Sequence, residues 1–201
     1  MEDRLSLIRK AVAASSDTAW RLLRHSNLVR PDLTELTGAT LVRRQLLLWV
    51  DSAGLTDLQP HTLSVFQTFA AESPVLRKAV WARSHDFRMI RQLAEDPSIP
   101  VPQEIPATIS ILDTRVDRDT YHKLLQEAYS LKFPIAWPWN NRPWTITTDT
   151  GTSGFEFFDA ADPPSSVRWT LATEMGREGR ALSDWFERMY TWLNQQTQPV
   201  E

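Results

Sequence analysis

The stretch that decides how this chain is organised is PSIPVPQEIP, residues 97–106. Four of its ten residues are proline. Proline lacks the backbone N–H that a helix interior or a central strand requires, so neither element is expected to cross this stretch. The sequence therefore predicts a proline-rich linker at 97–106 between a domain of residues 1–96 and a domain of residues 107–201.

The segment before the linker reads as a helical bundle. Apolar residues recur at helical spacing near its start, as they do in an amphipathic helix. Ser73 is placed as an N-cap and Pro74 as a first helical residue, which is a usual way to begin a helix. Further helices are predicted over residues 40–52, 61–71 and 73–94.

The segment after the linker alternates between strand-like and helix-like patterns. Short β-type runs are separated by turn residues, and the last apolar stripe has helical spacing. The expected order is a strand at 107–112, a helix at 119–132, strands at 144–148, 154–158 and 167–171, and a helix at 174–195. The predicted fold class is α+β, with an all-helical N-terminal half followed by a small sheet with covering helices, in the order β-α-β-β-β-α.

Composition narrows the class of protein. Hydrophobic residues make up 42% of the chain and charged residues 23%, which is typical of a packed globular protein. There is no cysteine, which excludes disulfides and thiolate chemistry and favours a cytoplasmic location. No apolar run is long enough for a membrane span, and the start of the chain has no apolar signal-peptide core, so no membrane association is expected. The net charge of −3 divides into +4 up to residue 92 and −7 after it.

Tryptophan is the unusual component, with nine residues. Trp137, Trp139 and Trp144 lie in FPIAWPWNNRPW, residues 133–144, beside three prolines. Rigid aromatic side chains on a proline-stiffened segment lose little entropy on binding, so these three are the candidate partner-binding residues. The alternative is that they fold back and close the core, as a tryptophan on a strand or on the final apolar stripe would.

Residues 33–55, LTELTGATLVRRQLLLWVDSAGL, resemble the helix-turn-helix of bacterial winged-helix regulators. Gly38, Val42 and the terminal Ala-Gly-Leu match that pattern in kind, although the gap between Gly38 and Val42 is about two residues short. The resemblance implies DNA binding, with Arg43 and Arg44 meeting phosphates or guanine edges in a major groove. The alternative is a helical hairpin with both arginines in solvent.

The sequence carries no strong catalytic motif. Asp149 begins an Asp-Thr-Gly-Thr run that matches aspartic proteases by letter, but the run has no second copy and no apolar strand before it. Asp113, Asp117 and Asp119 cluster after a predicted strand, where α/β folds often keep carboxylates that bind divalent metals, yet capping of the following helix by Asp117 or Asp119 is the simpler explanation. The four histidines form no metal-binding or catalytic pair, and we expect them on helix faces or at the surface. We therefore name no catalytic residue, no metal ligand and no cofactor.

These observations lead to one hypothesis and two alternatives. The leading hypothesis is a non-enzymatic cytoplasmic binding or adaptor protein with a regulatory role, which acts through contacts with another protein or with itself. The first alternative is a DNA-binding transcriptional regulator that uses residues 33–55. The second is an enzyme with a carboxylate or histidine site that the sequence does not reveal.

Overall fold

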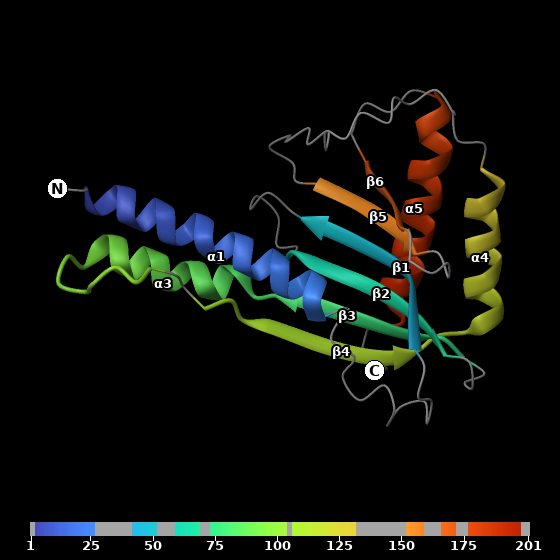
Figure 1. The fold of residues 1–201 in the computed structure, drawn as a ribbon, viewed down its shortest axis with the longest axis horizontal. Helices are drawn as coiled ribbons and strands as arrows, with labels where there is room; N and C mark the ends of the chain where they lie inside the picture. Colours follow the sequence, from blue (N-terminus) through green and yellow to red (C-terminus); the bar gives the residue numbers. More distant parts are fainter. Residues whose placement is uncertain are drawn as a thin grey trace.

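The computed structural model describes residues 3–26, 42–51, 59–68, 73–103, 106–131, 152–158, 166–171 and 177–197. Within those ranges the chain forms four helices and six strands, in the order α1, β1, β2, β3, α3, β4, α4, β5, β6, α5. The protein therefore has a mixed α+β fold, as the sequence predicts, but its strands begin well before the proline-rich stretch (Figure 1).

The six described strands form one antiparallel sheet in the order β4-β3-β2-β1-β5-β6. They are β1 (Val42–Asp51), β2 (His61–Thr68), β3 (Val75–Trp81), β4 (Ile109–Arg115), β5 (Thr152–Phe158) and β6 (Ser166–Leu171). The pairing of β1 with β2 shifts register once, between Arg44 and Leu46. Strands from both sides of the proline-rich stretch share this sheet, since β3 pairs with β4 and β1 pairs with β5. The division into two domains at 97–106 stays a prediction.

The all-helical interpretation of residues 1–96 is wrong. The segments 40–52 and 61–71 form β1 and β2, and the segment 73–94 forms β3 followed by helix α3 (Arg83–Glu95). In β1 the four consecutive residues 46–49 are all buried, because both faces of this central strand are covered. A strand buried on both faces gives a continuous apolar run, whose periodicity does not separate it from a buried helix.

The elements predicted after the linker are confirmed where the structure describes them. β4, β5 and β6 lie at the predicted strands, α4 (Arg118–Ser130) lies at the predicted helix 119–132, and α5 (Arg177–Gln195) closes the chain. The predicted strand at 144–148 lies outside the described residues. Asp117 caps α4, because its carboxylate accepts the backbone N–H of Thr120 at 2.8 Å.

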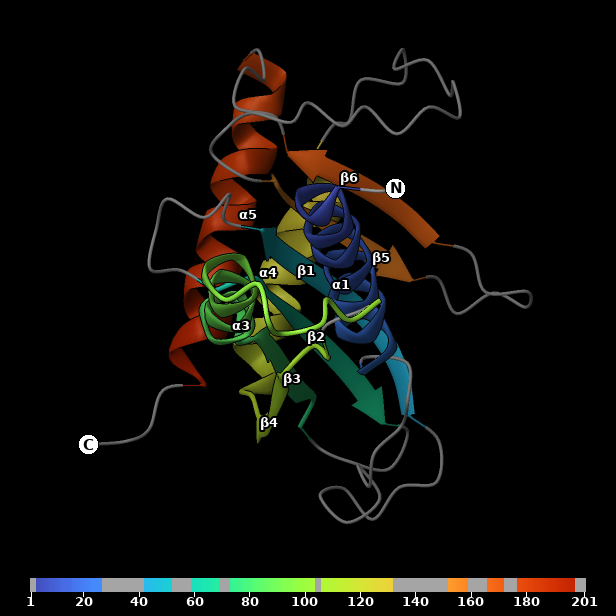
Figure 2. The same ribbon diagram turned by 90° about the vertical axis from the view of Figure 1, so that its left-hand side faces the viewer.

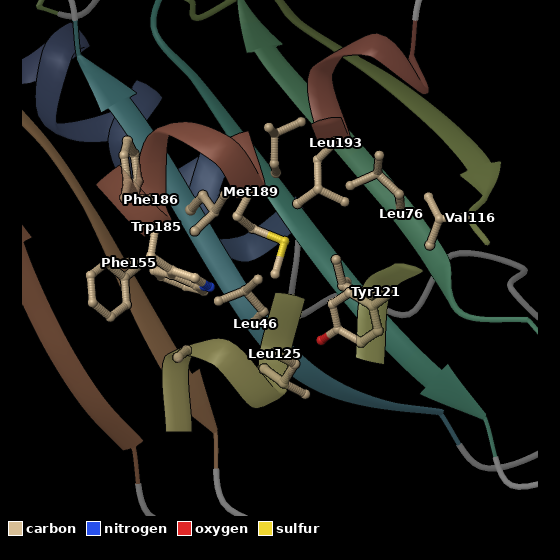
Figure 3. Close-up of a cluster of buried hydrophobic side chains, with 14 of the residues drawn as sticks. Leu46, Leu76, Val116, Tyr121, Leu125, Phe155, Trp185, Phe186, Met189 and Leu193 are labelled. Carbon is tan, nitrogen blue, oxygen red and sulfur yellow. The ribbon is translucent and has the colours of Figure 1, made fainter. Parts of the chain in front are cut away.

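The larger core lies between one face of the sheet and helices α4 and α5 (Figure 3). Trp185 of α5 is fully buried there, with its ring 5.1 Å from that of Phe155 in an edge-to-face arrangement. Its indole N–H donates to the backbone carbonyl of Leu124 in α4 at 2.7 Å, so the one polar atom of this side chain is satisfied. Trp185, which lies on the apolar stripe of the last predicted helix, is therefore a core residue.

The opposite face of the sheet is covered in part by α1 (Arg4–Ser26). Ala19 and Leu23 of this helix pack against Ala79 and Trp81 of β3. The first half of α1 extends past the sheet and lies beside α3, and the pair projects from the body of the molecule as a helical arm (Figures 1 and 2). The Arg4 guanidinium joins the two helices at the tip. It donates to backbone carbonyls at the carboxyl end of α3 and just beyond it, including that of Leu93 at 2.7 Å. A cation at this position also interacts favourably with the helix dipole of α3.

Candidate functional site

The candidate binding residues from the sequence do not form one site among the residues that the structure describes. Trp137, Trp139 and Trp144 lie outside the described residues, so their proposed role stays a prediction. Arg43 and Arg44 lie on β1 rather than on a helix, which means that the predicted second helix of the helix-turn-helix is wrong. Arg43 is exposed, whereas the guanidinium carbon of Arg44 lies 3.9 Å from the ring centroid of Phe158 on β5.

The carboxylates that suggested a metal site have separate structural roles. Asp113 lies on β4 and Asp117 is the cap of α4. Hydrogen bonds from the side chain and from the backbone N–H of Thr120 hold the pKa of Asp117 below its ordinary value. Among the residues that the structure describes, no group of three or more histidine, aspartate or glutamate side chains has a metal-binding arrangement.

The feature that stands out is the outer edge of β4, here called the β4 edge and defined by residues 109–115. β4 is the terminal strand of the sheet and pairs with β3 alone among the described strands. Its pairing with β3 runs over seven residues without a register shift. Ile111 and Leu112 are each 49% exposed and lie on opposite faces of the sheet, so the edge is apolar on both sides. Figure 1 shows α3 beyond one end of β4 and α4 beyond the other, which leaves the middle of the strand uncovered by these helices.

The hydrogen-bond pattern shows which backbone groups point outward. The carbonyl of Thr108 accepts from Ala82 and the N–H of Val116 donates to Pro74, so even-numbered residues of β4 face β3. Antiparallel pairing alternates direction from one residue to the next. The N–H and carbonyl groups of Ile109, Ile111, Asp113 and Arg115 therefore point away from the sheet. An edge of this kind can accept another strand.

A buried ion pair holds β4 against the sheet. Arg77 of β3 lies directly opposite Asp113 and has no exposed surface. Its guanidinium donates from Nε to Oδ1 of Asp113 at 2.7 Å and from a terminal nitrogen to Oδ2, which makes the pair bidentate. The pair belongs to a row of side chains that crosses the sheet on its α1 side. From β4 to β5 the row consists of Asp113, Arg77, Ser64, Leu47 and Glu156. Arg77, Ser64, Leu47 and Glu156 are all buried, and Asp113 is partly buried. The carboxylate of Asp113 therefore pairs with Arg77 of the neighbouring strand and does not present a repelling charge to a strand that approaches the edge.

The start of β4 is fixed by a second buried carboxylate. Asp86 of α3 is 4% exposed and accepts three hydrogen bonds from two residues. The indole N–H of Trp81 donates to it at 2.7 Å, and Thr108 donates its backbone N–H at 2.9 Å and its hydroxyl at 2.8 Å. Three sets of contacts therefore restrain β4. Asp86 bonds to Thr108 before the strand, Arg77 bonds to Asp113 within it, and the Asp117 cap of α4 follows its end.

A separate polar cluster lies at the sheet face covered by α5. The Nδ1 of His61 is 2.7 Å from the carbonyl of Gln59 and donates to it, so Nε2 accepts from the hydroxyl of Tyr190 at 3.0 Å. Burial lowers the pKa of His61, and nearby Lys78 adds to this effect. Burial also lowers the pKa of Lys78, whose ammonium donates to Asn194 at 2.7 Å. The expectation that the histidines lie at helix faces or at the surface is wrong for His61, which is a neutral, buried strand residue that fastens α5 to the sheet.

Comparison of the chain with protein-family models, with curated proteins and with solved structures gave no match. Among the described helices, none combines the length and apolarity needed to cross a membrane.

The sequence revealed only part of this site. The sequence predicts a strand at 107–112, but the position of that strand at the edge of the sheet depends on the pairing order and has no local signal. The sequence places Arg77 in a helix, so no local pattern indicates that it meets Asp113. The exposure of Ile111 and Leu112 follows only from the completed sheet.

We predict that the ion pair contributes to stability through strong coupling between its two members. Asp113→Asn removes the negative charge that the guanidinium of the fully buried Arg77 contacts, and it should lower the free energy of unfolding by about 3 kcal/mol or more. Combining it with Arg77→Met should cost clearly less than the two single changes together. Urea unfolding of the three variants measures this.

The exposed ion pair between Arg188 and Glu127, with 55% and 40% of the side chains exposed, supplies the control. Glu127→Gln should change the free energy of unfolding by less than about 1 kcal/mol. Additive effects of Asp113→Asn and Arg77→Met would show that the buried pair does not anchor β4.

Proposed function

We propose that this chain is a non-enzymatic binding protein that acts by pairing the β4 edge with an extended segment of a partner protein. The observation that carries the proposal is that a regular edge strand has apolar side chains, Ile111 and Leu112, half exposed on both faces. Adding a strand to a sheet edge is a common mode of protein recognition, in which backbone hydrogen bonds provide affinity and side chains provide specificity. The proposal keeps the adaptor hypothesis and adds that the partner binds at the β4 edge.

Within its own residues, 109–115, the edge lacks the sequence features that usually prevent strand addition. Protected edges carry bulges, prolines or charged side chains, lysine above all. Between residues 109 and 115 there is no proline or lysine, the register has no bulge, and Asp113 is paired inward with Arg77. Only Arg115, at the end of the strand, adds an exposed charge.

The rigidity of the edge also supports binding. A strand fixed in its bound conformation loses little entropy when a partner segment pairs with it. The contacts of Asp113 and Asp86 restrain β4 before any partner arrives. We also propose a cytoplasmic location, since a chain without cysteine needs no oxidising compartment.

A peptide-display experiment tests this function without knowledge of the natural partner. Peptides selected from a random library on the whole chain should bind it as extended strands, and Ile111→Lys/Leu112→Lys should weaken their binding by about tenfold or more. Fluorescence anisotropy of labelled peptides measures the affinities.

The matched control is Leu5→Lys/Met89→Lys, which places the same charges at exposed apolar positions of the helical arm, 58% and 47% exposed in the native chain. Its peptide affinity should stay at that of the native protein. Equal binding by the edge variant, or selection of no binding peptide, would overturn the proposal.

A second candidate function is binding of the nucleic-acid phosphate backbone by the helical arm. Helices α1 and α3 together hold eight lysines and arginines against three acidic residues, a net charge of +5, so the rest of the chain has −8, and six of the eight cations lie on α3 and the first half of α1, which form the arm. Arg4 and Arg83 make internal contacts, whereas Arg9, Arg88 and Arg91 are exposed. Charge concentrated on a projecting element attracts a polyanion that the acidic remainder would repel.

This candidate is tested by anisotropy with a labelled DNA duplex at two salt concentrations. For roughly four phosphate contacts, affinity should fall about 100-fold between about 50 and 200 mM salt. Arg9→Glu/Arg88→Glu/Arg91→Glu should abolish binding and Arg43→Ala on β1 should not. Absence of binding at low salt, or a loss caused by Arg43→Ala, would contradict a role for the arm.

A further inference from the structure

The end of helix α5 is held to the sheet by polar contacts that converge on two strand residues. The hydroxyl of Tyr190 meets Nε2 of His61 on β2 at 3.0 Å. The ammonium of Lys78 on β3 donates to Asn194 at 2.7 Å, and it donates at 3.4 Å to Thr197, just beyond the helix. The last two turns of α5 are therefore fastened to β2 and β3 through one histidine and one lysine.

The contacts of His61 suit a neutral imidazole ring. Nδ1 donates to the carbonyl of Gln59, which leaves Nε2 as the acceptor for the hydroxyl of Tyr190. A proton on Nε2 would turn that acceptor into a donor and would place a positive charge on a residue that is 4% exposed. Lys78 lies on the same face of the neighbouring strand, so the new charge would also face a like charge. Protonation of His61 therefore opposes the docking of α5.

No carboxylate among the described residues is placed to balance that charge. Strands β2 and β3 contain no acidic residue. The one acidic residue of β1 is Asp51, which follows the residue opposite His61, so its side chain turns to the other face and pairs there with Arg83 at 3.1 Å. The charged residues of α5 either are exposed or lie three turns or so before Tyr190 in the sequence: Asp184, Glu187 and Arg188 in the first group, and Arg177, Glu178 and Arg180 in the second.

We propose that the contact between His61 and Tyr190 is an acid-sensitive latch, which releases the end of α5 from the sheet when His61 is protonated. Burial holds the pKa of His61 below its ordinary value of 6.5, so the folded chain favours the neutral ring. The stability that this ring contributes is complete above about pH 6.5, and it is lost as the pH falls from there to the lower pKa of the folded chain.

Release would uncover apolar residues beneath the end of α5, such as Leu193, which has no exposed surface. The latch lies on the sheet face that α5 covers and uses none of the residues of the β4 edge. It is therefore independent of whether a partner binds at that edge.

Urea unfolding of the whole chain at two pH values tests the latch. Between about pH 7.5 and 5.5, the unfolding equilibrium constant of the native chain should rise about five- to tenfold more than that of His61→Gln, whose amide accepts a hydrogen bond but does not titrate. His85→Gln removes an exposed histidine of α3 and should keep the native pH dependence. Lys78→Gln removes the like charge and should show a smaller rise.

An equal rise in the native chain and in His61→Gln would overturn the proposal. If His61→Gln does not fold, Lys78→Gln decides the matter, because a pH dependence identical to that of the native chain would overturn it as well.

Amide hydrogen exchange tests whether the end of α5 opens before the whole chain unfolds. Protection factors of Tyr190, Leu193 and Asn194 should lie below that of Leu125 in α4, and they should fall about five- to tenfold between the two pH values. Equal protection of the two helices at both pH values would mean that α5 opens only on complete unfolding, which would contradict a latch. The same fall in His61→Gln would assign it to another group.

Discussion

The bidentate pair between Arg77 and Asp113 is the interaction on which the arrangement of the sheet edge depends. Arg77 is completely buried on the side of the sheet that α1 partly covers, so its charge requires a counter-charge at close range. Asp113 supplies it from directly across the β3-β4 ladder. A shift of β4 by one residue would move Asp113 to the other face of the sheet and break its two hydrogen bonds with Arg77, so the pair fixes the register.

The properties of the β4 edge follow from that register. With Asp113 turned inward, the outward-pointing backbone groups of β4 are flanked by Ile111 and Leu112 and by few charges. The carboxylate of Asp86 restrains the start of the strand through Thr108, and the cap of α4 follows its end. A buried charge pair inside the sheet thus produces a rigid, apolar edge outside it, which is the physical basis of the proposed partner binding.

The sequence predicted the second half of the fold far better than the first. In α5 the apolar residues follow a clear helical stripe, and β5 and β6 are short runs between turn residues, so local patterns were sufficient. In β1 the apolar run at 46–49 is buried on both faces, and its length suited a helix equally well. Ser73 and Pro74 resembled a helix start, but Pro74 is buried before β3 and its carbonyl accepts from Val116. Tertiary pairing therefore overrode the local signal.

The candidate site was hidden for a related reason. Its components come from β3, α3 and β4, and the meeting of Arg77 with Asp113 across 36 positions of sequence depends on the strand order. The sequence identified Asp113 as a notable carboxylate but suggested a metal. The tryptophans that the sequence emphasised divide between the core, where Trp185 lies, and residues outside those that the structure describes.

Amide hydrogen exchange resolved along β4 measures the state of the edge residue by residue. In the free protein we expect protected amides at Ser110, Leu112 and Thr114 and fast exchange at Ile109, Ile111 and Asp113. With a selected peptide bound, the second group should become protected because the edge is occupied. Equal protection of all six amides in the free protein, or fast exchange at Ile109, Ile111 and Asp113 with the peptide bound, would contradict an open edge that a partner strand completes.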